Sequence, residues 1–441
     1  MAQENTLLST PEAQQGLAPA QATRREPWLL RQARRLVVSR LEQLVEGSLV
    51  IHGNGETQRF GGRESDSLQG EISVHDSSFW ERVAWGGSIG AGEAFCDGLW
   101  STPDLTAVVR VLARNQEALD GLDSGAGALA DPARRFLHRR RSNTRQGSIR
   151  NISAHYDTGN EFFARFLDPT LTYSCAIFPD STSTLETAQE WKLDTICRKL
   201  DLQETDRLVE IGTGWGGLAI HAARNYGCRV VSTTISQEQF RYASQAVEDA
   251  GLADLIDVVQ VDYRDLPSLG YERFDKLVSI EMIEAVGHSY LPKYFEVISE
   301  LLEPDGLALV QAILIPDQRY EGYRRTVDFI QQYIFPGSLL PSMGRIMECT
   351  TGSTDLRLVD YDDLTLDYAR TLAEWRRRFE ANESEIAALG LTETERRKWL
   401  FYFGYCEGGF AERTVADAQL LFAKPANGRQ SSTDDLYRKE S

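Results

Sequence analysis

A glycine-rich segment near the middle of the chain has the residue types and spacing of a nucleotide-binding loop. Residues 207–211, Arg-Leu-Val-Glu-Ile, have the pattern of a buried strand and run directly into Gly212-Thr-Gly-Trp-Gly-Gly217, after which a helix is expected. Glycine has no β-carbon, so such a turn lets a ligand approach the backbone at the N-terminus of the helix. The pattern alone is weak, because nicotinamide and flavin enzymes share it.

The residues around this loop favour S-adenosylmethionine over a nicotinamide cofactor. A NAD site expects an acidic residue about 20 residues further on, whereas the second strand ends here in Thr233-Thr234. Glu210 lies two residues before the first glycine, an order typical of S-adenosylmethionine enzymes. Its carboxylate is expected either near the amino group of the ligand or in support of the loop. The predicted cofactor contacts here are Glu210, Gly212, Gly214 and Gly216.

Two later segments are expected at the same edge of the sheet, because ligands of open parallel sheets bind at the carboxyl ends of the strands. Thr234, Ser236 and Gln239 open the helix after the second strand and offer hydroxyl and amide contacts. Asp262-Tyr263-Arg264 follows the third strand, where an acid, an aromatic ring and an arginine can frame an adenine. Each segment alone would be ordinary helix-capping chemistry. Together with the glycine loop they predict an adenosyl ligand.

The elements that position these residues alternate between strands and helices, which predicts a Rossmann-like, doubly wound α/β sheet. Strands are predicted at 207–211, 229–234, 256–261, 274–280 and 307–315. Helices are predicted at 217–225, 237–250 and 291–302, then at 366–382 and 392–403, with a helical insertion at 320–333. The residues before this region mix a short strand at 47–52 with a helix at 103–116, which predicts a smaller α+β domain.

A chain of 441 residues is long enough for two domains. The predicted organisation is a disordered start, the smaller N-terminal domain, a basic linker, the domain of the doubly wound sheet with its helical insertion, and a disordered tail. Their ranges are 1–26, 27–131, 132–150, 151–424 and 425–441.

Charge is unevenly distributed along the sequence. The net charge is −18, which argues against a general nucleic-acid binder, yet residues 1–150 hold 18 Arg, no Lys and 18 acidic residues. Between residues 24 and 44, arginines alternate with Trp28 and leucines at near-helical spacing. Such a helix either lies against anionic headgroups or packs as a solvated amphipathic helix on its own domain, and both interpretations stay open.

Targeting signals and metal-binding patterns are missing from the sequence. The six cysteines form no C-x-x-C pair and no zinc spacing, which is typical of reduced thiols. The first 23 residues lack the basic start and apolar stretch of a signal peptide, and no apolar run approaches a membrane span. We therefore expect a cytoplasmic protein that reaches the inner face of the membrane peripherally, with no bound metal.

Several motifs together resemble the cyclopropane-fatty-acyl-phospholipid synthase family, which includes the mycolic-acid cyclopropane synthases. The resemblance covers roughly residues 150–424 and, more loosely, 80–120. Besides the glycine loop, its marks are His155-Tyr-Asp-Thr-Gly-Asn160, Leu171-Thr-Tyr-Ser-Cys-Ala176, Glu281-Met-Ile-Glu-Ala-Val-Gly287, Tyr333-Ile-Phe-Pro-Gly337 and Cys406. The resemblance implies S-adenosylmethionine as cofactor, with Tyr173 and Ser174 touching it, and unsaturated phospholipid acyl chains as substrate. It also implies that residues 151–424 are a methyltransferase catalytic domain with helical acyl-binding insertions, and that residues 27–131 are a lipid-surface domain. A lipid-facing homodimer is common in such enzymes.

The chemistry of such a family follows from the poor nucleophilicity of an isolated alkene. The site must place the alkene against the sulfonium methyl and exclude water. Attack creates a carbocation, which aromatic faces and a carboxylate stabilise. A base must then remove a proton from the added methyl so that the ring closes. The resemblance implies a bound bicarbonate as this base, held by Cys175, Glu284, Ile313 and Tyr368.

One position departs from the family pattern. Where the family has a histidine beside the bicarbonate, this chain has Gln311, which can donate a hydrogen bond but cannot carry charge or shuttle a proton. His288 is either a substitute or an ordinary turn residue. Cys406 matches a cysteine sometimes treated as catalytic, although no step requires a thiolate. The aromatic residues between Tyr320 and Phe335 either line an acyl tunnel or form core.

The sequence thus predicts a cyclopropane fatty acid synthase that adds a methylene from S-adenosylmethionine across a cis double bond of a phospholipid acyl chain. Gln311 supports an alternative. In that alternative, a related methyltransferase gives a methyl-branched or methylene fatty acid, or methylates a small molecule, without closing a ring. A non-catalytic lipid-binding protein is disfavoured, because the cofactor loop and Glu284 are both intact.

Overall fold

The computed structural model describes residues 27–62, 67–116, 147 and 159–428. The predictions for residues 1–26, for nearly all of the basic linker at 132–150 and for the tail beyond residue 428 lie outside the described residues. The predicted boundary near residue 150 falls in the same gap and stays a prediction.

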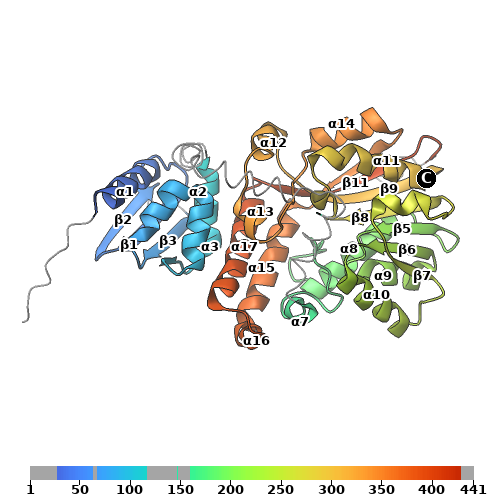
Figure 1. Cartoon of the computed structure of the whole chain (residues 1–441), viewed down its shortest axis with the longest axis horizontal. Coiled ribbons are helices and arrows are strands. Elements are labelled where there is room, and N and C mark those ends of the chain that lie inside the picture. The colour runs from blue at the N-terminus through green and yellow to red at the C-terminus, as the bar shows by residue number, and fades with distance from the viewer. Residues whose placement is uncertain (1–26, 63–66, 117–146, 148–158, 429–441) are drawn as a thin grey trace, which may run out of the picture.

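The N-terminal region is a small α+β unit, as predicted, and forms the left-hand part of Figure 1. Its sheet has the order β2-β1-β3-β4. The strands are β1 (Ser48–Gly53), β2 (Glu56–Gly61), β3 (Gln69–Val74) and β4 (Trp100–Ser101), and the helices are α1 (Trp28–Leu41), α2 (Ser78–Cys96) and α3 (Leu105–Arg114). Asn54 and Gly55, both with positive φ, close the β1–β2 hairpin, which is the usual chemistry of a tight hairpin turn.

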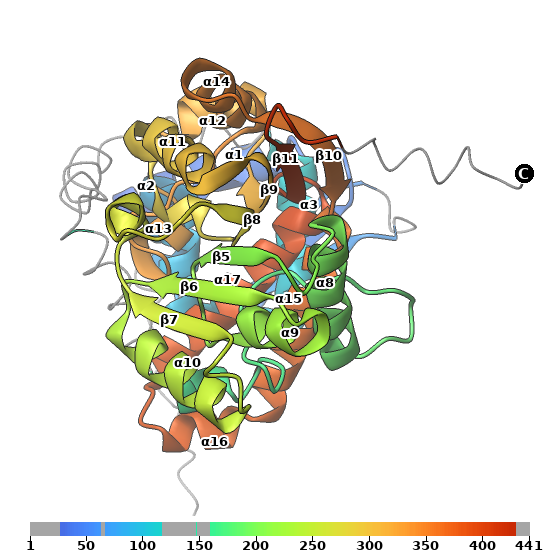
Figure 2. The same ribbon diagram turned by 90° about the vertical axis from the view of Figure 1, so that its right-hand side faces the viewer.

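The larger region contains a seven-stranded sheet of order β10-β11-β9-β8-β5-β6-β7, and Figure 2 shows β5, β6 and β7 side by side with their arrows lying across the view. The five strands predicted from the sequence are confirmed as β5 (Arg207–Ile211), β6 (Arg229–Thr234), β7 (Ile256–Gln260), β8 (Phe274–Ile280) and β9 (Leu302–Leu314). They pair in parallel. The sequence prediction missed β10 (Arg357–Asp363) and β11 (Ala416–Ala423), which complete the sheet through antiparallel pairs.

Helices cover both faces of this sheet, so its inner strands are apolar on successive residues. Val209 and Leu277 belong to one core cluster, whereas their neighbours Leu208 and Val278 belong to another. The first cluster packs under α11 (Leu291–Leu301) and α14 (Met343–Ser353). The second packs under α8 (Leu185–Lys199), α9 (Gly217–Tyr226) and α10 (Gln237–Asp249). The predicted doubly wound fold is confirmed.

Helices from the C-terminal part of the chain stand between the two regions (Figure 1). They are α15 (Thr365–Ala381), α16 (Glu383–Ala388) and α17 (Glu393–Ala411), with α7 (Asn160–Phe163), α12 (Asp317–Tyr323) and α13 (Phe329–Tyr333) nearby. A β-carbon on Gly404 or Gly408 of α17 would lie within 2.8 Å of Leu105 or 2.6 Å of Val109 on α3. These glycines let α3 and α17 pack closely.

Polar contacts fix the same interface. Arg397 donates to the backbone carbonyls of Phe95 and Trp100 at 2.6 and 3.0 Å. Glu412 accepts from both Arg110 and Arg114 at 2.6 and 2.8 Å. A single apolar core runs from α1 and the small sheet into α15 and α17. The N-terminal region is therefore held firmly against the helices of the larger region.

Candidate active site

The glycine loop between β5 and α9 adopts the conformation that its sequence requires. Gly212, Gly214 and Gly216 have φ of 103°, 53° and 92°, values that other residues rarely adopt. A β-carbon built on Gly214 meets nothing within 4 Å, so open space lies directly against this backbone. The loop lines the main cavity of the described structure, and this open space fits an adenosyl ligand.

The side chain of Glu210 is linked to this loop through the hydroxyl of Ser232. This side chain is buried, and the Ser232 hydroxyl donates to its carboxylate while also lying 2.5 Å from the hydroxyl of Thr213. Burial raises the pKa of Glu210 to about 8. Of the two roles predicted for this carboxylate, support of the loop is the one that these contacts favour.

The other predicted cofactor segments lie at the same edge of the sheet. Ser236 caps α10 through the backbone N–H of Gln239, whose side chain accepts from the Thr234 hydroxyl at 2.8 Å. Arg264 donates to the carboxylate of Asp262 through Nε at 2.8 Å and through Nη2 at 2.5 Å. Tyr263 lies between them, with its hydroxyl buried and without a hydrogen-bond partner in the described part of the chain.

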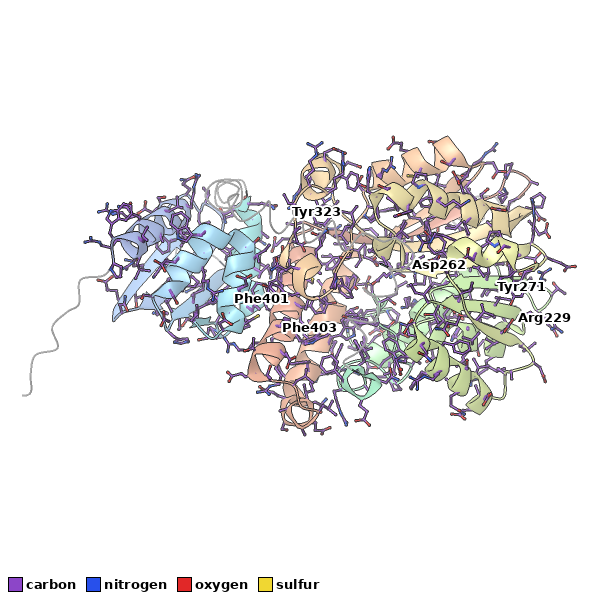
Figure 3. The ribbon with its side chains drawn as sticks, viewed as in Figure 1. Arg229, Asp262, Tyr271, Tyr323, Phe401 and Phe403 are labelled. Atoms are coloured by element: carbon purple, nitrogen blue, oxygen red, sulfur yellow. The ribbon has the colours of Figure 1, made fainter. Side chains whose placement is uncertain are left out.

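A cavity of about 910 Å³ connects this edge with the interior of the N-terminal region. It begins at the glycine loop, passes Tyr173, Ser174, Glu284 and Tyr368, and continues past Ile330 and Cys406 between α13 and α17. Its far end is lined by Leu41, Ile72, Val83, Trp100 and Val108, all apolar. In Figure 3, Asp262 marks the end near the sheet, and Tyr323 lies toward the N-terminal region.

A cluster of polar side chains lies beside the cavity where β8 ends. Glu281 accepts hydrogen bonds from the backbone N–H of Cys175 at 2.7 Å, from Nε2 of Gln311 at 2.9 Å and from the hydroxyl of Tyr368 at 2.7 Å. Gln311 also donates to Asp417 at 2.9 Å. These residues come from β8, β9, α15, β11 and the segment before α8, so only the tertiary fold assembles them.

Glu281 has an unusual backbone for an active-site acid. Its φ is 47°, in the left-handed region where a residue with a β-carbon is strained by about 1–3 kcal/mol. Such strain persists only where surrounding contacts impose it, and it concentrates at functional sites. The three donors and the Gln311 carbonyl, which accepts from the Glu281 N–H at 2.9 Å, are contacts of this kind.

A buried lysine supplies positive charge to this cluster. Lys192 of α8 is only 1% exposed and donates to the hydroxyl of Ser174 at 2.7 Å. Burial lowers its pKa, and the neighbouring charges of Glu281 and Asp417 oppose that effect. Burial likewise raises the pKa of Asp417, and the charge of Glu281 raises it further.

Glu284 lies one 3₁₀ turn beyond Glu281 and also lines the cavity. Its Oε1 accepts from the backbone N–H of Ile313 at 2.6 Å, whereas its Oε2 is buried and has no hydrogen-bond partner among the described residues. Burial, reinforced by the charge of Glu281, raises the pKa of Glu284 to about 8. This carboxyl group therefore has one oxygen available to a ligand in the cavity.

The residues present do not fit the bicarbonate that the family resemblance implies. The backbone N–H of Cys175, the amide of Gln311 and the hydroxyl of Tyr368 all donate to Glu281, and the N–H of Ile313 donates to Glu284. A bicarbonate in this position would have to displace carboxylates of the chain itself. The predicted residues do come together, but around a side chain that the prediction did not include.

Some of the remaining predicted residues line the cavity, and others pack elsewhere. Cys406 lines the cavity, but burial raises the pKa of its thiol, as it does for the fully buried Cys175, so neither is a ready nucleophile. His288 bonds to the hydroxyl of Tyr320 at 2.7 Å and does not line the main cavity, which is the ordinary turn role. Tyr323 and Phe335 line the cavity, whereas Phe329 packs on Phe401.

Three residues of the cluster were missed from the sequence: Glu281, Lys192 and Asp417. A signal existed for the first two. Glu281 directly follows a predicted strand, where ligand-facing residues are expected. Lys192 falls on the buried stripe of α8 with Leu185, Ala188 and Ile196, a position where a charge must have a partner. Asp417 lies on a strand that was itself missed.

Helix α1 packs its apolar stripe against its own region. Leu30, Ala33, Val37 and Leu41 are buried, while Trp28 is 63% exposed. Arg34 pairs with Glu56 at 3.2 Å. No helix in the described ranges has both the length and the apolar character needed to cross a bilayer.

Comparisons with known proteins agree with this site. A family model described as mycolic acid cyclopropane synthetase matches residues 143–420. A tuberculostearic acid methyltransferase of Mycobacterium tuberculosis is 40% identical over 336 residues, covering 75% of this chain and 77% of the relative. The cyclopropane-fatty-acyl-phospholipid synthase of Escherichia coli K12 is 34% identical over 364 residues, covering 81% and 89%.

A solved structure extends the agreement to the fold and the cofactor. A mycolic acid cyclopropane synthase in complex with S-adenosylhomocysteine (SAH) and CTAB superposes with a TM-score of 0.58 and 31% identity, covering 63% of this chain and 98% of the other. The chain therefore belongs to the mycolic acid cyclopropane synthetase family and is an S-adenosylmethionine-dependent methyltransferase of the cyclopropane synthase type.

Proposed function

We propose that this chain transfers the methyl group of S-adenosylmethionine to a carbon–carbon double bond in an unsaturated fatty acyl chain of a membrane phospholipid. The observation that carries the proposal is the continuous cavity that joins the glycine loop to an apolar interior. A small polar substrate would gain nothing from the apolar far end, whereas burial of an acyl chain is favourable by about 0.8 kcal/mol per CH₂.

The residues of the chain suit this reaction. The bound cofactor supplies an electrophilic methyl group at its sulfonium. Gly212, Gly214 and Gly216 would let the cofactor approach the backbone, with Asp262 and Tyr263 beside its adenine. Tyr368 stacks on Phe410 at 4.3 Å, and both line the cavity. Their ring faces and the Glu284 oxygen that has no partner among the described residues would stabilise a developing carbocation.

We infer a product without a ring. No histidine is found among the described residues that line the cavity, and Gln311 is a neutral amide whose donors and acceptor are all engaged within the chain. The relative described as a tuberculostearic acid methyltransferase also shares more identity with this chain than the Escherichia coli cyclopropane synthase does. Electron balance requires this product to be an alkene, because a saturated branch would need a hydride donor.

Cyclopropane formation is the second candidate. It is supported by the family description and by the similarity to the Escherichia coli phospholipid synthase over 81% of this chain. Both candidates share the methyl transfer step and the same acyl substrate. They differ after the methyl transfer: the ring closes as the added methyl loses a proton, whereas the unringed product needs a hydride shift before that proton is lost.

Lipid mass spectrometry in a bacterial host without such enzymes separates the outcomes. Expression of the chain should increase the mass of unsaturated acyl chains by one CH₂. The unringed alkene takes up hydrogen at the added branch, whereas a cyclopropane resists mild hydrogenation. A product that resists hydrogenation would show that the ring forms and would contradict the unringed product. Unmodified lipids, with the protein folded and binding SAH, would contradict the proposed function.

A further inference from the structure

Three hydrogen-bond donors converge on the carboxylate of Glu281. They are a backbone N–H, a side-chain amide and a phenol, from Cys175, Gln311 and Tyr368, at 2.7, 2.9 and 2.7 Å. Such convergence is the geometry of an anion-binding site, since two or three donors stabilise a negative charge that is otherwise costly to bury. The anion is part of the chain, because it is the side chain of residue 281.

The family resemblance assigns Cys175 and Tyr368 to a bound bicarbonate, and Gln311 stands where the family has a histidine beside that ion. Glu281 lines the cavity, as do Glu284 and Tyr368, beside the space where the acyl chain would lie. A bicarbonate and a carboxylate share the planar pair of oxygens that such donors recognise. The side chain of Glu281 therefore takes the place of a diffusible ion.

We propose that Glu281 is the built-in base of this enzyme, accepting the proton that the added carbon loses, so that the reaction does not require bicarbonate. This inference rests on the proposed function, and it deepens that proposal by naming the group that completes the reaction. It holds for either product, because both require loss of one proton from the added carbon.

The step balances in atoms and electrons. The π electrons of the alkene form a bond to the methyl carbon as the carbon–sulfur bond breaks, which releases SAH and leaves a cation on the chain. For the unringed product, a hydride shifts from the methylated carbon to its neighbour. The Glu281 carboxylate then takes a proton from the added methyl, and the C–H electrons become the double bond of a methylene branch. Water takes the proton from the carboxylic acid when product leaves.

Glu281 suits this role better than the two acids beside it. Asp417 does not line the cavity. Glu284 accepts from the backbone N–H of Ile313, and burial raises its pKa to about 8, so near neutral pH it holds its own proton. Burial also raises the pKa of Glu281, but the three donors and the charge of Lys192 act in the opposite direction. The surroundings of Glu281 thus favour its ionised form most.

The test compares the wild-type protein with Glu281→Gly in buffer freed of carbon dioxide, with SAH release measured on vesicles of unsaturated phospholipid. Wild-type turnover should be the same with and without added bicarbonate. Glu281→Gly removes the carboxylate and relieves the positive φ, so it should fold but lose about 10²–10³-fold in turnover. Added bicarbonate should raise the turnover of Glu281→Gly at least tenfold, because the ion can accept hydrogen bonds from the donors that no longer have a carboxylate.

Two controls separate a base from a structural charge. Glu281→Gln keeps the size and the hydrogen-bond acceptor but not the charge, so it should lose activity and gain nothing from bicarbonate. Asp417→Asn changes an acid in the same cluster away from the cavity and should not respond to bicarbonate either. As a readout other than activity, bicarbonate should raise the melting temperature of Glu281→Gly and leave that of the wild type unchanged.

The outcomes distinguish this inference from the proposed function. A wild-type enzyme that turns over on unsaturated vesicles only when bicarbonate is present would overturn the inference and leave the proposed function standing. Wild-type activity in Glu281→Gly without bicarbonate would overturn it as well. A wild type that releases no SAH with unsaturated vesicles under any condition would instead contradict the proposed function.

Discussion

The two sides of the cavity are built in different ways. On the cofactor side, several polar contacts join residues close in sequence, as in the Ser236 cap on Gln239 and the Asp262–Arg264 pair, and the Ser232–Glu210 contact spans 22 positions. On the acid side, Glu281 contacts residues 106, 30 and 87 positions away. Contacts between close neighbours in sequence are kept whenever a protein has the same loop. Contacts between distant segments depend instead on every element that brings those segments together. The second side is therefore where we expect members of a family to differ in chemistry.

This contrast explains what could be predicted from the sequence. The glycine loop and its flanking strands were placed correctly, because a buried strand, three glycines and a capped helix are all local signals. The donors Cys175, Gln311 and Tyr368 were also named, through a family resemblance. Their shared partner Glu281 was not, because a strained acid at the end of a strand has no local signal for what it contacts. The edge strand β10 was missed because its sequence, Arg-Leu-Val-Asp-Tyr-Asp-Asp, is largely polar, and β11 was missed because its apolar run from Leu420 to Ala423 is short.

The largest effect is expected on the cofactor side, from Gly214→Val. The open space beside this residue would be filled by a branched side chain in a backbone conformation that it tolerates poorly. SAH binding measured by calorimetry should fall below detection. Gly251→Val is the matched control, since Gly251 also has positive φ and open space but lies in an exposed turn. Near-normal affinity in a folded Gly214→Val protein would place the cofactor elsewhere.

Above about pH 8, where Glu284 is ionised, Glu284→Gln should lower turnover by roughly 10²–10³, as loss of one preorganised charged group typically does. SAH affinity should barely change, because this carboxyl group acts on the acyl cation. Since the ionised form is the one that stabilises a cation, wild-type turnover should rise with pH through about 8, following the raised pKa of Glu284. A pH–rate profile of Glu284→Gln without that rise is expected, and an identical rise in the variant would assign it to another group.

A smaller effect is expected on membrane binding through the surface of α1. Each arginine replaced there should weaken binding to anionic vesicles by at most about tenfold. Arg31 and Arg35 are exposed, and headgroup attraction is worth about 1 kcal/mol per arginine near an anionic membrane. Changing both to Gln should reduce co-sedimentation with anionic vesicles, most clearly at low salt. The exposed Arg229 and Arg357 of the larger sheet provide the control pair (Figure 3 labels Arg229). Unchanged sedimentation would leave α1 as an ordinary packed helix.

The smallest expected effect is on the way the free energy of unfolding changes with pH, through Glu210 on the cofactor side of the cavity. Burial raises the pKa of Glu210 from 4.5 to about 8, so in this window the folded protein holds a proton that the unfolded chain releases. The free energy of unfolding should therefore fall as pH rises from about 4.5 to 8. Glu210→Gln should make this decline shallower in urea unfolding series at several pH values. An equal decline in the variant would show that other groups cause it.

The test of Glu281 as a base held within the chain uses S-adenosylmethionine with a fully deuterated methyl group, unsaturated phospholipid vesicles and buffer free of bicarbonate. We expect the added carbon in the product to retain two deuterium atoms, because Glu281 has removed the third. A product that retains all three, or no product until bicarbonate is supplied, would contradict it.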